Sequence, residues 1–103
     1  MAKRRRRRVR LGSSPQVHAK EAGRALYDLQ LGLQDMEMSQ GPLDCRLLVK
    51  QLHGVNTAQG TATAHVYAMS KSDPQQHTFK AVLDKLRNRV ASVEGHFVHS
   101  CLR

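Results

Sequence analysis

Apolar residues recur every three or four positions along this 103-residue chain, and this spacing most constrains the fold. Alternating steps of three and four keep residues on one face of an α-helix. One such series follows Pro15: Ala19, Ala22, Leu26, Leu29, Leu33 and Met36. Another follows Pro74: Phe79, Leu83, Leu86, Val90, Val93 and Phe97. Each series predicts an amphipathic helix with one face turned to a core.

The middle of the chain keeps the same rhythm with weaker helix formers. Its series is Cys45, Leu48, Leu52, Val55, Gln59, Ala62, Val66 and Met69. Glycines and β-branched residues here each cost up to about 1 kcal/mol relative to alanine, so a break near 54–56 is one alternative. We favour a single helix from about Leu43 to Ser70, because tertiary packing overrides propensity. A break would instead give four helices.

The three prolines mark where helices begin. Pro15, Pro42 and Pro74 are the only prolines, and proline is well tolerated at the first helical position. Asp73 before Pro74 and Ser14 before Pro15 are good N-caps. Short linkers between the helices favour antiparallel neighbours. The sequence therefore predicts an all-α, up-down-up three-helix bundle over residues 14–103, preceded by a flexible arginine-rich arm over residues 1–13.

The arm concentrates positive charge. The whole chain has 17 Lys and Arg against 8 Asp and Glu, a net charge of +9. Seven of these bases lie in the first ten residues: Lys3, Arg4, Arg5, Arg6, Arg7, Arg8 and Arg10. The other 93 residues carry 10 bases and 8 acids, a net of only +2. A row of arginines beside a nearly neutral bundle predicts binding to a dense row of phosphates.

The predicted topology sorts the remaining charges. It places the start of the first helix beside the end of the second and the start of the third. Four bases then fall at that end as secondary nucleic-acid contacts: Lys20, Arg24, Lys71 and Lys80. Four acids fall at or toward the opposite end: Asp35, Glu37, Asp44 and Glu94. We expect Arg46 and Lys50 to compensate Asp35 and Glu37, which lie near a helix C-terminus that disfavours acids.

These features predict a non-enzymatic protein that binds DNA or RNA with little sequence preference, as packaging, architectural or ribonucleoprotein components do. The arm has no aromatic residue on which bases could stack. A helix-turn-helix around Gly54 is a weaker hypothesis, because Lys50 and Gly60 do not fit the motif. The alternative function is a helical assembly or adaptor module that oligomerises or binds a protein. Gln59, polar on an apolar seam, could then fix the register.

The cysteines and histidines predict no cofactor and no metal. A zinc site from Cys45, His96, His99 and Cys101 lacks the usual closely paired ligands, so Cys45 is interpreted as a small buried hydrophobe. A Cys45–Cys101 disulfide is disfavoured in a reducing compartment. His18, His65 and His77 are expected near the arm, as surface or boundary residues. Since no signal peptide or membrane-spanning stretch is found, we expect no membrane insertion and an intracellular protein: cytoplasmic, nuclear in a eukaryote, or within a nucleoprotein particle.

Overall fold

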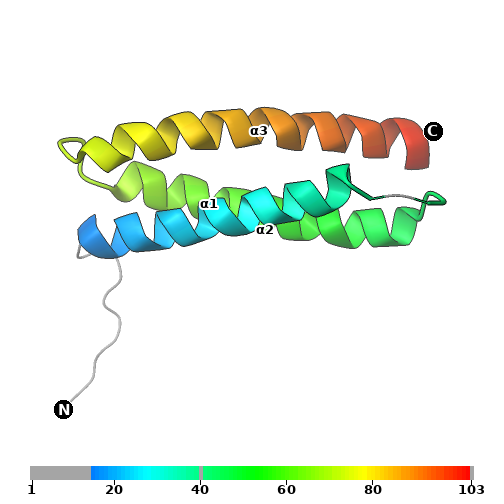
Figure 1. Cartoon of the computed structure of the whole chain (residues 1–103), viewed down its shortest axis with the longest axis horizontal. Helices are drawn as coiled ribbons and strands as arrows, with labels where there is room; N and C mark the ends of the chain where they lie inside the picture. The colour runs from blue at the N-terminus through cyan, green and yellow to red at the C-terminus, as the bar shows by residue number, and fades with distance from the viewer. Residues whose placement is uncertain (1–14, 40, 103) are drawn as a thin grey trace, which may run out of the picture.

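The computed structural model describes residues 15–39 and 41–102, which form three α-helices and contain no strand (Figure 1). They are α1 (Pro15–Glu37), α2 (Cys45–Ala68) and α3 (Pro74–Cys101). This confirms the all-helical class and the number of helices in the bundle. The arm lies outside the described residues.

The middle segment is one uninterrupted helix. α2 continues through Gly54, so the described residues contain no fourth helix. The same continuity removes the turn that a helix-turn-helix needs between its two helices. The helix-turn-helix hypothesis is therefore wrong, because packing of the α2 seam outweighs the low propensity of its glycines.

The three helices lie side by side along the long direction of the molecule (Figure 1). The start of α1 and the α2–α3 connection lie at one end, which we call the arm end because the chain enters α1 there. The α1–α2 connection and the end of α3 lie at the opposite end, called the far end. No helix in the described ranges is long and apolar enough to cross a membrane.

Side-chain capping sets where α2 and α3 begin. Asp44 accepts hydrogen bonds from the backbone N–H groups of Arg46 and Leu47, both at 3.1 Å, so α2 begins at Cys45. Pro42 therefore precedes the helix, and the expectation that it opens the helix is wrong. Asp73 accepts from the backbone N–H of Gln75 at 2.9 Å, as predicted for the cap of α3.

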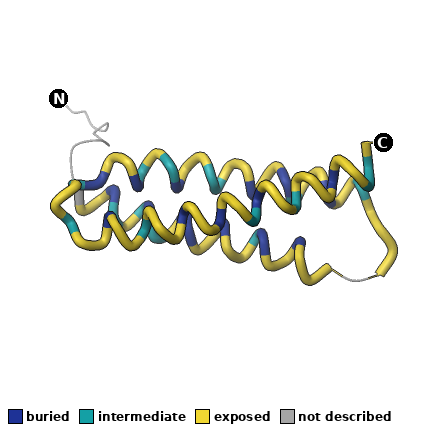
Figure 2. The backbone as a smooth tube through the Cα atoms, turned by 90° about the horizontal axis from the view of Figure 1, so that it is seen from above, coloured by how far each residue is buried: buried dark blue, intermediate teal, exposed yellow. Residues whose placement is uncertain are grey.

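The core follows the apolar series read from the sequence. Buried residues form one stripe on each helix, and these stripes face one another inside the bundle (Figure 2). On α1 and α3, Ala19, Phe79 and Val93 are partly buried and every other member of the two predicted series is buried. On α2 and the residue after it, the buried members are Leu48, Leu52, Val55, Ala62, Val66 and Met69. The seam polar residue Gln59 is half-buried.

One glycine allows α1 and α2 to approach closely. A Cβ atom built on Gly32 would lie 3.0 Å from Cγ2 of Val55, which is tighter than an ordinary contact. Val55 is only 2% exposed, and its β-branched side chain has little rotamer freedom in a helix. Gly54, by contrast, has nothing within 4 Å of its Cβ position.

This difference predicts opposite effects of two alanine substitutions. Gly54→Ala should raise the free energy of unfolding by about 0.5–1 kcal/mol, because alanine is the better helix former and space is free. Gly32→Ala has the same helical gain but overpacks against Val55 at a cost of about 1–3 kcal/mol. We therefore expect Gly32→Ala to fall below wild type in urea unfolding. Equal stabilisation by both substitutions would show that the close approach does not exist.

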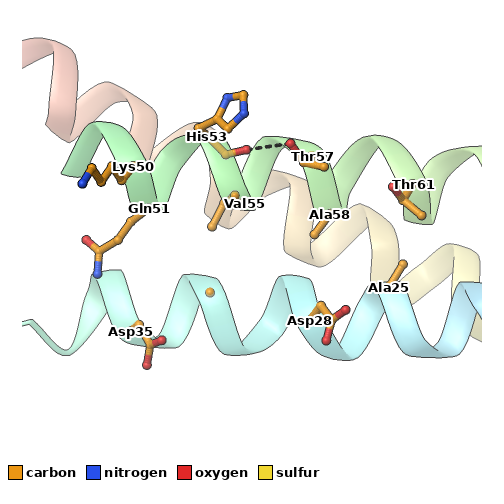
Figure 3. Close-up of a pocket in the computed structure, with 12 residues that line it drawn as sticks. Ala25, Asp28, Asp35, Lys50, Gln51, His53, Val55, Thr57, Ala58 and Thr61 are labelled. Carbon is orange, nitrogen blue, oxygen red and sulfur yellow. Dashed lines mark hydrogen bonds between the residues drawn. The ribbon is translucent and has the colours of Figure 1, made fainter. Parts of the chain in front are cut away.

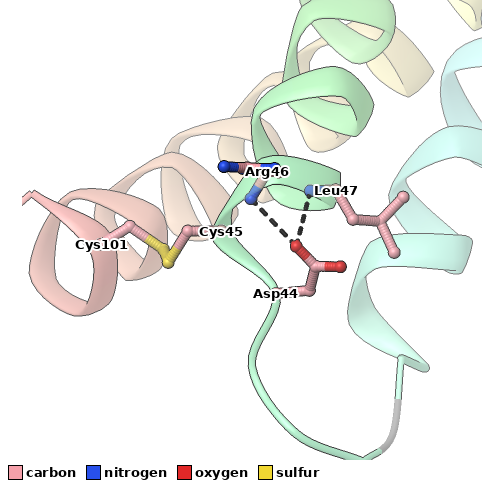
Figure 4. Close-up of a disulfide and its surroundings, with 5 residues drawn as sticks. All are labelled: Asp44, Cys45, Arg46, Leu47 and Cys101. Atoms are coloured by element: carbon pink, nitrogen blue, oxygen red, sulfur yellow. Dashed lines mark hydrogen bonds between the residues drawn. A yellow bond between two sulfur atoms is a disulfide. The ribbon is translucent and has the colours of Figure 1, made fainter.

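The two cysteines form a disulfide at the far end. Cys45 opens α2, Cys101 closes α3, and their Cα atoms lie 5.8 Å apart (Figure 4). The interpretation of Cys45 as a free buried hydrophobe is therefore wrong, since neither cysteine is a free thiol. The sulfur atoms are also unavailable to the four-ligand zinc site considered above. The pairing depends on helix lengths. α2 and α3 bring the start of α2 next to the end of α3, although 56 positions separate the two cysteines in the sequence.

Loss of this cross-link should destabilise the bundle. For a double Cys45→Ser and Cys101→Ser variant we expect a decrease of about 2–4 kcal/mol in the free energy of unfolding. Without the cross-link, the unfolded chain has more conformational entropy, which favours unfolding. Denaturant unfolding with and without dithiothreitol measures this. Reductant should destabilise the wild type and leave the double variant unchanged. Two titratable thiols in the denatured, unreduced wild type would contradict the pairing.

Candidate nucleic-acid interface and neighbouring groups

The predicted primary contacts, Lys3–Arg8 and Arg10, lie outside the described residues. Their role in phosphate binding stays a prediction. The chain that carries them joins the described structure at Pro15, the first residue of α1. What the structure describes is the surface next to this junction.

All four predicted secondary contacts lie toward the arm end and are exposed. Lys20 and Arg24 lie in the first half of α1, Lys71 in the α2–α3 connection and Lys80 in the second turn of α3. The start of α1, the α2–α3 connection and the start of α3 lie at one end of the molecule (Figure 1). The structure thus brings the bases to the same end through three separate elements.

Lys20 and Arg24 border a shallow hollow between the starts of α1 and α3. The hollow is also lined by Asp73, whose carboxylate caps α3. The Asp73 carboxylate would repel an anion inside the hollow. Lys20 and Arg24 therefore contribute positive charge at its rim. Arg24 lies 3.9 Å from Glu21, and the Arg24 side chain is 70% exposed. Such a loose, solvated pair contributes little and can exchange for a phosphate.

Lys80 of α3 contacts α2. Its Nζ is 5.8 Å from the centre of the Tyr67 ring on α2, a cation–π contact. At an exposed site this is worth about 0.5–1 kcal/mol. Lys80 thus lies over one face of the Tyr67 ring, while the residue stays 52% exposed.

Two histidines meet at the arm end. Nδ1 of His18 on α1 lies 2.9 Å from Nδ1 of His65 in the last turn of α2. His18 is only 7% exposed and His65 is half-buried, whereas His77 is exposed. The expectation that His18 is a surface or boundary residue is therefore wrong. His18 lies four residues before Ala22 and His65 three after Ala62, so both extend the apolar stripes, and this signal could have revealed them.

One ion pair joins α1 to α3 nearer the far end. Arg89 donates two hydrogen bonds to the Glu37 carboxylate, one of them from Nε at 3.0 Å. Arg46 and Lys50 were the expected partners, but Glu37 is compensated by Arg89 instead. The guanidinium of Arg89 lowers the pKa of Glu37 through these bonds, and the carboxylate raises the pKa of Arg89. The rotation of α1 against α3 decides this choice, and periodicity does not specify it.

A second hollow of about 690 Å³ lies between α1 and α2 (Figure 3). The side chain of Gln51 points from α2 toward α1 there, and its Oε1 is buried without a hydrogen-bond partner. Asp28 and Asp35 border the hollow from α1, and Lys50 and His53 border it from α2. Small residues of both helices, among them Ala25, Gly32, Gly54 and Ala58, line the rest of the hollow.

Comparisons with known proteins identify no relative. No protein-family model matches the chain, and neither a curated protein nor a solved structure matches it.

The Glu37–Arg89 pair makes a defined pH prediction. Because the folded-state pKa of Glu37 is lowered from 4.5, its contribution to stability is present above that value and is lost as pH falls through the folded pKa. Both side chains are more than one third exposed, so the contribution is at most about 1 kcal/mol. We expect Glu37→Gln to be less stable than wild type at pH 7, and this difference to shrink as low pH protonates the Glu37 carboxylate. A difference that persists at low pH would contradict this origin.

Proposed function

We propose that the chain is a non-catalytic nucleic-acid-binding protein in which the arm neutralises phosphates of DNA or RNA. In this proposal an up-down-up bundle holds the arm at one end. One observation carries the proposal. The segment with seven bases in ten residues precedes α1, and α1 begins at the end of the bundle where Lys20, Arg24, Lys71 and Lys80 are exposed. Positive charge is thus concentrated around one point of the molecule.

Arginine suits this role for a geometric reason. Its planar guanidinium presents forked donors that match two phosphate oxygens, whereas lysine offers a single point charge. Each neutralised phosphate releases counterions, so seven contacts give a slope of log affinity against log salt of about −6. Contacts of this kind position a protein on a backbone and carry little sequence information. The proposed function is therefore largely sequence-independent binding.

A specific observation supports the alternative, a helical module that assembles with itself or another protein. α1 and the residue after it expose apolar side chains away from the core stripe: Tyr27 is 61% exposed, Leu31 41% and Met38 66%. These residues are spaced by four and seven, which keeps them near one face of the helix. An apolar row of this kind can pair between chains, with the arm then docking on an acidic protein surface.

Replacing Arg4–Arg8 by glutamine in the full chain tests the first proposal. We expect the salt slope for a DNA or RNA duplex to weaken by about 4 to 5, because five fewer phosphates are neutralised. Affinity at 50 mM salt should fall by orders of magnitude. Fluorescence anisotropy titrations over a salt series measure both. Keeping the chain length constant ensures that charge alone is changed.

Arg46→Gln is the matched control. Arg46 is exposed at the far end, and it should alter affinity much less than any single arm substitution. An unchanged affinity and slope after replacing Arg4–Arg8 would reject phosphate binding by the arm. If sedimentation of that same variant also showed a defined oligomer, the assembly function would be the better explanation.

A further inference from the structure

The His18–His65 pair brings together two imidazole nitrogens from α1 and α2. Both rings present Nδ1 to the other at 2.9 Å, with ring centres 5.1 Å apart and planes tilted by 40°. Two nitrogens bound to one tetrahedral zinc ion, each at about 2.0–2.1 Å, lie about 3.3 Å apart. To admit such an ion, the two nitrogens must separate by about 0.4 Å, and each ring must turn so that its lone pair points to one side of the N···N line.

We propose that His18 and His65 form a binding site for a divalent transition-metal ion of the zinc class, joining α1 to α2 at the arm end. Imidazole nitrogen is a preferred ligand of Zn²⁺, Cu²⁺ and Ni²⁺. The site is independent of the proposed nucleic-acid binding, because it uses neither the arm nor the four exposed bases. It is also distinct from the zinc site considered from the sequence, whose cysteines are bonded to each other.

The chemistry balances without any further reactant. In the metal-free pair one Nδ1 carries a hydrogen and donates it to the other Nδ1, whose lone pair accepts. On binding, the donating ring moves its proton from Nδ1 to Nε2 through solvent, so both Nδ1 lone pairs face the ion. Both imidazoles stay neutral and no net proton is released. Metal binding is thus a change of tautomer in one ring.

One local feature favours a metal ion at this point and acts against the repulsion from the exposed bases at the same end. His65 lies in the last turn of α2, where the helix dipole places partial negative charge. His18 is held by burial on the core stripe of α1, which limits the entropy lost when it is fixed by an ion. His65 is half-buried, so solvent and ions reach the pair. The described residues contain no group of three or more His, Cys, Asp or Glu placed for a metal, so the pair supplies two protein ligands and the proposal requires water at the remaining positions.

The test uses the full chain labelled with ¹⁵N at histidine and titrated with ZnCl₂. Long-range ¹H–¹⁵N spectra distinguish Nδ1 from Nε2 in each ring. We expect zinc to shift the Nδ1 signals of His18 and His65, leaving Nε2 protonated in both. In parallel, zinc should raise the melting temperature of the wild type, because it binds the folded state. His18→Gln and His65→Gln should each weaken zinc binding by at least about tenfold.

His77→Gln and His53→Gln are matched controls, because both histidines are exposed and should leave zinc binding unchanged. A double His96→Gln and His99→Gln variant removes any contribution from these two histidines on α3. Because the spectra report individual rings, the proposal remains testable even if His18→Gln folds poorly. Zinc that leaves the His18 and His65 signals unmoved, or stabilises His65→Gln as strongly as wild type, overturns the proposal and leaves the pair a hydrogen bond only.

Discussion

Burial of three apolar stripes against one another is the constraint on which the rest of the structure depends. The core is almost entirely aliphatic, and each helix contributes one face to it. Close approach of α1 and α2 relies on the missing side chain of Gly32 beside Val55. Because rigid helices run the length of the bundle, that packing also decides which residues meet at each end. Both the disulfide and the histidine pair are consequences of it.

Periodicity therefore predicted the three helices and nearly all of their buried residues. It placed the boundaries less well: α2 begins at Cys45 because Asp44 caps it, and a cap is a local hydrogen-bond choice that apolar spacing does not contain. Periodicity also did not predict the disulfide between Cys45 and Cys101. Their pairing depends on α2 starting and α3 ending at the same level, which is a property of helix lengths and of the intervening connection.

In the candidate interface, too, some features follow from the sequence and others only from the structure. Connectivity alone placed Lys20, Arg24, Lys71 and Lys80 at the arm end, since it requires only the order and direction of the helices. The pairings Lys80–Tyr67 and Glu37–Arg89 depend on how far each helix is rotated about its axis. One-dimensional spacing tolerates many such rotations. The contacts that decide which bases stay available to phosphate thus come only from the three-dimensional structure.

Those contacts sharpen the contrast between bundle and arm. Arg89 is held by Glu37, Lys80 lies over an aromatic ring, and Lys20 and Arg24 border a hollow that contains the Asp73 carboxylate. Residues 15–102 carry nine bases against eight acids, so little excess charge remains there to bind a polyanion. In the proposed function, long-range attraction to phosphate therefore comes from the seven bases of the arm. The bundle contributes position and rigidity, with one covalent cross-link at the far end and, in our proposal, a metal-bridged contact at the arm end.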